Sequence, residues 1–212
     1  MRHKFDRPSL KTLNVHNALI AVALTAGAAL AGPAIGEPAP DFAGEDIAGQ
    51  SWNLARLKGR PVVLEWLSTA CPYVRKHYAS GNIPSLQHEA KTAGAVWLSV
   101  VPTWRHAPLG REDTGVGAAG WLQEAAPTAT LIDRSGELTR AYRPRTTPHF
   151  YLIDAVGVLV YKGAADDRAT TDPADLAGAN HHLRSALSDL MAGRRVAEPV
   201  VRPYGSPIRY WA

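Results

Sequence analysis

Several apolar runs along the chain have the length and composition of buried strands. Val, Leu, Ile and aromatic residues dominate these runs, and glycine, proline or charged residues bound them. Continuous apolar runs of this length are typical of strands that are covered on both faces. The predicted strands are Pro61–Leu67, Ala95–Val101, Thr128–Asp133 and a pair within Phe150–Gly163 that turns at Asp154–Gly157.

Amphipathic segments separate these strands. Asp172 is a residue type that caps helices, Pro173 suits the first helical position, and Gly193 suits a helix end. Alternating strands and helices predict parallel pairing, whereas the hairpin predicts an antiparallel edge. We therefore expect an α/β fold, a central mixed β-sheet flanked by helices on both faces. Helices are predicted over Cys71–Tyr78, Ile83–Thr92, Ala118–Ala125 and Asp172–Gly193. A short strand or a hairpin is expected in 43–60, and a long loop over 102–117.

The first 31 residues differ from the rest of the chain. A basic start precedes the apolar run Ala18–Ala31, which ends in the small residues Ala29-Leu30-Ala31. This pattern predicts a signal peptide over 1–31 and export, to the periplasm, and the run is short for a membrane span. An uncleaved anchor is the alternative. The net charge is +4, and three of these charges lie in the leader. The remaining chain therefore gives no electrostatic reason to expect a nucleic-acid partner.

Cys71 is the only cysteine, so no disulfide can form within the chain. It follows a predicted strand and precedes a predicted helix that starts with Pro72. A thiolate is the reactive form of cysteine, and a helix N-terminus favours negative charge. Arg75, Lys76 and His77 add positive charge within two turns. The alternative interpretation is a small buried apolar residue without reactivity.

Two further features accompany this cysteine. Glu65 interrupts an apolar strand six residues earlier, and buried acids near a thiol can move protons. Glu65 could instead face outward or pair with a lysine. Thr147-Pro148 directly precedes a strand, where proline is unusual. A cis bond there would direct the backbone of Thr147 toward a neighbouring site, and a plain trans proline is the alternative.

These motifs together resemble the thioredoxin superfamily. The stretch "VVLEWLSTACPYVRK" is similar to its strand, Cys-x-x-Cys and helix signature, and "TTPHFYLID" is similar to its cis-proline loop. The lead-in "IGEPAPDF" resembles the exported redoxin branch, of the alkyl hydroperoxide reductase/thiol-specific antioxidant type. The resemblance covers 35–193 as a thioredoxin-like domain and leaves 194–212 as a C-terminal tail.

The resemblance also implies roles for the site residues. Cys71 would attack a disulfide or peroxide, Glu65 would be the family's buried acid, and the backbone at Thr147 and Pro148 would hold the substrate. The resemblance assigns substrate binding to the residues that follow the nucleophile, namely Pro72, Tyr73 and Arg75.

The chain departs from the family pattern at several positions. Val74 replaces the resolving cysteine, and Ser206 stands in a tail where relatives often carry a cysteine. The peroxidase pattern Pro-x-x-x-Thr-x-x-Cys is altered, because Leu64 replaces the proline and Ser68 replaces the threonine. Arg143 and Arg145 are the candidates for its guanidinium.

One activated thiol can form a mixed disulfide or a sulfenic acid and then needs an outside thiol for its release. The sequence therefore predicts a thiol-dependent oxidoreductase that acts on disulfides or sulfenic acids of exported proteins. Its expected partners are an external thiol reductant or a partner protein thiol. The alternatives are a one-cysteine peroxidase and a redox-inactive binding module. The eight histidines have no metal-ligand spacing, so neither a metal nor a cofactor is expected.

Overall fold

The computed structural model describes residues 32–102 and 125–210. The predicted signal peptide, most of the long loop and nearly all of the predicted helix Ala118–Ala125 lie outside these described residues. Within them, no helix has both the length and the apolar character that a membrane crossing requires.

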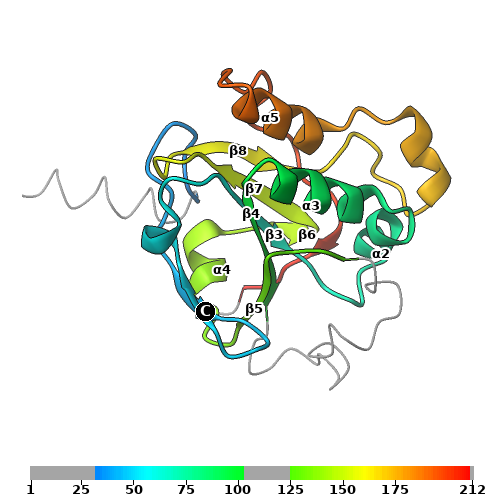
Figure 1. The fold of residues 1–212 in the computed structure, drawn as a ribbon. Coiled ribbons are helices and arrows are strands. Elements are labelled where there is room, and N and C mark those ends of the chain that lie inside the picture. Colours follow the sequence, from blue (N-terminus) through cyan, green and yellow to red (C-terminus); the bar gives the residue numbers. More distant parts are fainter. Residues whose placement is uncertain (1–31, 103–124, 211–212) are drawn as a thin grey trace, which may run out of the picture. The chain divides into compact units, whose positions relative to one another are not determined.

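A five-stranded mixed sheet forms the centre of the fold, in the order β5-β4-β3-β7-β8 (Figure 1). Strand β3 pairs in parallel with β4 and antiparallel with β7, and β4 pairs in parallel with β5. The antiparallel edge comes from the β7–β8 hairpin, as predicted. These strands are β3 (Val62–Trp66), β4 (Val96–Pro102), β5 (Ala129–Asp133), β7 (His149–Ile153) and β8 (Leu159–Gly163).

Helices cover both faces of this sheet, which confirms the predicted architecture. Side chains of β3 alternate between the two faces: Val63 contributes to one buried cluster, and Val62 and Leu64 contribute to the other. The first cluster includes side chains from α2 (Pro72–Ala79), α3 (Asn82–Thr92) and α5 (His182–Met191). The second includes side chains from the 3-10 helix η2 (Leu54–Leu57) and from α4 (Glu137–Tyr142).

Two short two-stranded sheets accompany the central sheet. An antiparallel hairpin forms from β1 (Ala43–Glu45) and β2 (Ser51–Asn53), the second of the two alternatives predicted for 43–60. A second two-stranded sheet joins β6 (Thr146–Thr147) to β9 (Ser206–Pro207) in antiparallel register. Strand β9 was not predicted, because 194–212 was expected only as a tail.

The prediction of one continuous helix from Asp172 to Gly193 is wrong. The structure divides this segment into the 3-10 helix η4 (Pro173–Gly178) and α5, with extended backbone at Ala179. Asp172 does cap the first piece, where it accepts a hydrogen bond from the Ala174 amide. A contact from outside the predicted helix accounts for the break, because the carboxylate of Asp167 accepts hydrogen bonds from both the backbone and the side-chain amide of Asn180. These bonds hold the chain out of a helical path.

Candidate active site

Cys71 stands at the N-cap of α2, and Pro72 occupies the first helical position as predicted. The Cys71 residue is only 2% exposed. The thiol donates a hydrogen bond to the backbone carbonyl of Thr147, with Sγ and O 2.9 Å apart. The hydroxyl of Ser206 donates to Sγ across 3.1 Å. The sulfur therefore lies between the Pro148 loop and the C-terminal tail.

The peptide bond between Thr147 and Pro148 is cis. Thr147 belongs to β6, is buried, and pairs directly with Ser206 of β9. The hydroxyl of Thr146 also donates to the backbone carbonyl of Tyr204. The segment that faces the sulfur is thus held by a short β-sheet whose second strand comes from the tail.

Glu65 is fully buried and lies on the Cys71 side of the sheet, because Val63 and Leu67 of the same alternation pack in the cluster that contains Cys71. Its Oε2 accepts hydrogen bonds from Tyr78, Trp97 and Ser99 at 2.8 to 3.0 Å. The Glu65 side chain therefore neither faces outward nor pairs with a lysine of the described residues.

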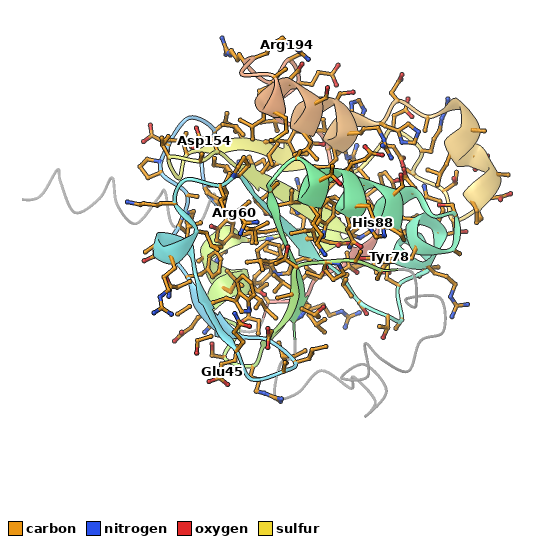
Figure 2. All side chains as sticks on the ribbon, viewed as in Figure 1. Glu45, Arg60, Tyr78, His88, Asp154 and Arg194 are labelled. Carbon is orange, nitrogen blue, oxygen red and sulfur yellow. The ribbon has the colours of Figure 1, made fainter. Side chains whose placement is uncertain are left out.

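Burial raises the pKa of Glu65 from 4.5 to about 7, and the hydrogen bonds from Trp97, Tyr78 and Ser99 oppose this rise. Its Oε1 has no hydrogen-bond partner among the described residues. The hydrogen bonds of Glu65 run to its polar neighbours and not to Sγ, so the acid and the sulfur share a face of the sheet without a direct bond. The hydroxyl of Tyr78 donates to Glu65 and so connects the acid to α2, the helix that follows Cys71. Tyr78 is labelled in Figure 2.

The three residues assigned to substrate binding surround the start of α2. Pro72 and Arg75 are exposed, and Tyr73 is half-buried. The ring of Tyr73 contacts that of Tyr204 edge to face, at 5.8 Å between centroids. Tyr73 therefore contacts the C-terminal tail across the site.

The candidates for a peroxidase site are not among the hydrogen-bond partners of the sulfur within the described residues. Ser68 accepts a hydrogen bond from the Cys71 amide through its backbone carbonyl, so it shapes the turn before the helix. The guanidinium of Arg143 lies over the ring of Tyr210, and Arg145 is exposed. Among the described residues, the hydrogen-bond partners of Sγ are Thr147 and Ser206 and include no arginine.

Residues 35–162, more than half of the chain, match the model of a family described as the AhpC/TSA family. The chain belongs to the AhpC/TSA family. No curated protein gives a significant sequence match to the chain.

Several solved structures are similar to this AhpC/TSA-family chain. An uncharacterized conserved protein from Geobacillus kaustophilus is 24% identical, with a TM-score of 0.69 over 84% of this chain and 93% of that chain. A hypothetical protein from Sinorhizobium meliloti 1021 is 24% identical, with a TM-score of 0.68 over 85% and 96%. A candidate protein disulfide isomerase from Bacteroides thetaiotaomicron is 20% identical, with a TM-score of 0.52 over 75% and 91%. The likeness is one of fold, and the predicted thioredoxin-like fold is confirmed.

The sequence analysis missed a buried polar cluster behind α2 in this AhpC/TSA-family protein. The ammonium of Lys76 donates to the carbonyl of Arg168 at 2.6 Å and to the hydroxyl of Tyr204 at 3.0 Å. The Tyr204 hydroxyl donates to Asp166 at 2.6 Å. Burial lowers the pKa of His77 to about 4, although Asp166 opposes this shift. His77 is therefore neutral at pH 7, and Lys76 is occupied by the tail, so neither supplies the free positive charge expected beside Cys71.

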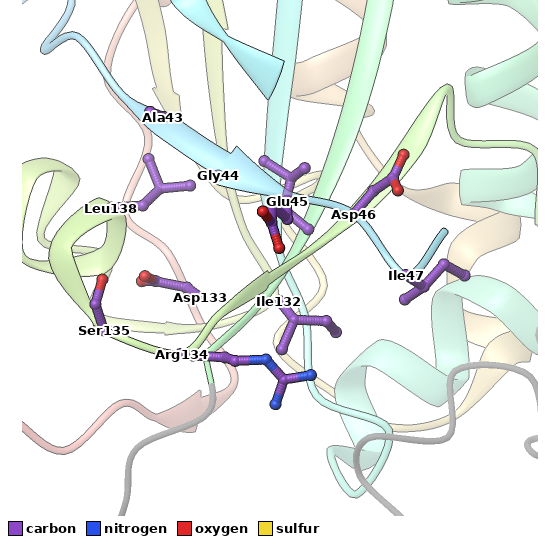
Figure 3. A pocket seen from close by; sticks show the side chains of 11 residues that line it. Ala43, Gly44, Glu45, Asp46, Ile47, Ile132, Asp133, Arg134, Ser135 and Leu138 are labelled. Atoms are coloured by element: carbon purple, nitrogen blue, oxygen red, sulfur yellow. The ribbon is translucent and has the colours of Figure 1, made fainter. Parts of the chain in front are cut away.

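The AhpC/TSA-family protein also has a surface hollow of about 380 Å³ between β1 and β5 (Figure 3). Two of its acidic side chains have structural partners: Asp46 accepts from the indole of Trp52, and Asp133 accepts from Thr139. The hollow shares no residue with the thiol site. The described part of the chain contains no group of three or more His, Cys, Asp or Glu side chains arranged to hold a metal.

Proposed function

We propose that this AhpC/TSA-family protein is a thiol-dependent oxidoreductase in which Cys71 is the single nucleophile. Its substrates are disulfides or sulfenic acids of exported proteins. The observation that carries the proposal is the position of Sγ, at the start of α2 and 2.9 Å from the Thr147 carbonyl. A backbone strand already lies against that carbonyl's segment, which supports a site for extended polypeptide.

With a single cysteine, the proposed reaction is thiol–disulfide exchange through a mixed disulfide with the substrate. The Cys71 thiolate attacks one sulfur of a disulfide, a new S–S bond forms, and the second sulfur leaves with the electron pair and takes a proton. With a sulfenic acid, the same attack releases water. Val74, fully buried, stands where a second thiol would complete the cycle. An outside thiol must therefore attack the mixed disulfide and restore Cys71.

Glu65 is proposed as the proton-handling residue of the site. A carboxyl group with a pKa of about 7 exchanges its proton near neutral pH, which suits a group that serves a thiol. Since Glu65 does not bond to Sγ in the described contacts, its proton would reach the sulfur through an intervening group. Thr147 and Pro148 are proposed to present the backbone that holds the substrate, and Pro72, Tyr73 and Arg75 are proposed to contact it.

A binding module without redox chemistry is the second candidate, and one observation favours it. The sulfur is almost fully covered, and its hydrogen bond to the Thr147 carbonyl requires the neutral thiol. The peroxidase alternative lacks a comparable observation, because no described guanidinium contacts Sγ.

Intact-mass spectrometry distinguishes the three functions. The protein and a Cys71→Ser control are treated separately with glutathione disulfide and with dilute peroxide. We expect a glutathione adduct on the protein alone, which excess thiol removes. Rapid, stoichiometric sulfenic acid formation that outpaces the adduct would instead identify a peroxidase. Absence of both products would indicate a binding module without redox chemistry.

Export is proposed from the leader sequence. The expected outcome is a periplasmic protein whose N-terminus is Gly32, directly after Ala31. N-terminal sequencing of the protein from fractionated cells measures this, and recovery of the uncleaved chain in the membrane fraction would identify an anchor instead.

A further inference from the structure

The strand β9 covers Cys71 in the manner of a bound peptide. Ser206 pairs with Thr147 across the β6–β9 sheet, and its hydroxyl lies 3.1 Å from Sγ. A cysteine at this register of a partner segment would present its sulfur to Cys71. The tail therefore marks where an extended polypeptide would lie, and which of its residues would face the nucleophile.

The residue before Ser206 must be a glycine. Gly205 has φ +138°, and a Cβ added to it would lie 2.0 Å from the carbonyl oxygen of Thr147 and 2.7 Å from its carbonyl carbon. These are backbone atoms of a buried residue in a paired strand, so they cannot move aside cheaply. Any segment that pairs with β6 in this register meets the same carbonyl.

Tyr204, two positions before Ser206, occupies a socket formed by Tyr73, Lys76 and Asp166. The Tyr204 hydroxyl lies between the buried side chains of Lys76 and Asp166, and its ring lies 4.9 Å from the Lys76 ammonium. The ring also packs edge to face on Tyr73. Departure of Tyr204 would leave a buried ammonium and carboxylate without their shared partner, which is costly.

We propose that β6 and this socket form the binding site for an extended partner segment that reads aromatic, glycine, cysteine. Tyr204–Ser206 is the chain's own copy of that segment, with serine in place of the cysteine. The inference rests on the proposed function. A tethered tail competes at an effective concentration on the order of millimolar, so a partner must restore the same contacts to displace it.

The chemical step needs no further reactant. The partner's cysteine arrives in a disulfide, and Cys71 Sγ forms a bond to its sulfur while the original S–S bond breaks. The departing thiolate takes the electron pair and a proton from water. The partner segment stays attached to Cys71 until an outside thiol releases it.

The test uses the full chain and three peptides based on the tail. The parent reads Arg-Pro-Tyr-Gly-Cys-Pro-Ile-Arg, and two variants carry alanine for its glycine or for its tyrosine. Each peptide is prepared as a mixed disulfide with 2-thiopyridine, so that attack releases a coloured product. Rates are measured on the natural protein and on Gly205→Ala and Tyr204→Phe, which weaken the tail. The control is Gly49→Ala, which also places alanine at a positive φ (+79°), but in the turn between β1 and β2, where its Cβ meets nothing within 4 Å.

We expect the parent peptide to react roughly tenfold faster or more with either tail variant than with the natural protein, and Gly49→Ala to match the natural protein. The alanine-for-glycine peptide should react at least about tenfold more slowly than the parent, and the alanine-for-tyrosine peptide should also be slower. Equal rates for all peptides would overturn this inference while leaving the proposed function intact. No reaction of either tail variant, even with small 2,2′-dithiodipyridine, would overturn both.

Discussion

Replacement of Glu65 by glutamine should change how the stability of the protein depends on pH. Burial raises the pKa of Glu65 in the folded state to about 7, whereas an exposed glutamate has a pKa of 4.5. The folded state therefore holds this proton more tightly than the unfolded state does. Because each pKa unit corresponds to about 1.4 kcal/mol, ionisation of Glu65 lowers the free energy of unfolding by about 3 kcal/mol.

The sign and the pH range follow from these two values. Below pH 4.5 both states carry the proton, and above pH 7 neither does. The stability contributed by the protonated acid is thus complete at low pH and is lost between about pH 4.5 and 7. Glutamine cannot ionise. The free energy of unfolding of Glu65→Gln minus that of the natural protein should therefore rise by about 3 kcal/mol from pH 4 to pH 8.

The difference between the two proteins is the quantity to measure, since other groups titrate in the same range. The lowered pKa of His77, about 4, makes the protein lose stability as the pH falls below 6.5, which opposes the effect of Glu65. Urea unfolding followed by tryptophan fluorescence at pH 4, 5, 6, 7 and 8 gives both curves. The exposed Glu45 provides the control Glu45→Gln (Figure 2). If the difference in the free energy of unfolding between the two proteins did not change from pH 4 to pH 8, the inference that burial raises the pKa of Glu65 would be refuted.

Three further substitutions test other parts of the structure. Val74→Cys places a second thiol in the helix that follows Cys71. We expect this variant to form an internal disulfide, detected by intact mass, and to catalyse the reduction of insulin by dithiothreitol, detected by turbidity. The natural protein should do neither. Thr139→Val removes the buried hydroxyl that accepts from the Trp66 indole at 2.9 Å, and should lower the free energy of unfolding by about 2 kcal/mol in urea. Gly163→Ala places a Cβ 2.4 Å from a tail carbonyl; we expect a lower melting temperature and faster alkylation of the sulfur by iodoacetamide.

Much of the fold follows from local pattern. The apolar run of β3, the proline after Cys71 and the Asp154–Gly157 turn each carry a local signal, and each element formed within a residue or two of its predicted bounds. In the turn, Asp154 accepts hydrogen bonds from the amides of Val156 and Val158, which explains why this sequence closes a hairpin.

The parts that could not be predicted depend on contacts between residues far apart in sequence. Lys76 and Tyr204 are separated by 128 residues, and Tyr204 and Asp166 by 38. No periodicity of α2 indicates that its lysine is buried against the tail. The break before α5 has the same origin, because Asp167 outside the helical pattern binds Asn180 inside it.

The cover that β9 forms over Cys71 also bears on how long the sulfur survives. A sulfenic acid without a neighbouring thiol has no quick reversible fate, and further oxidation gives sulfinic and sulfonic acids that most cells cannot reduce. This chain has no second cysteine to interrupt that sequence. In the resting protein the Thr147 carbonyl and the Ser206 hydroxyl bind the sulfur, and Cys71 is only 2% exposed, so little of it is open to an oxidant. The working lifetime of the molecule would then depend on how often β9 separates from β6 and exposes the sulfur.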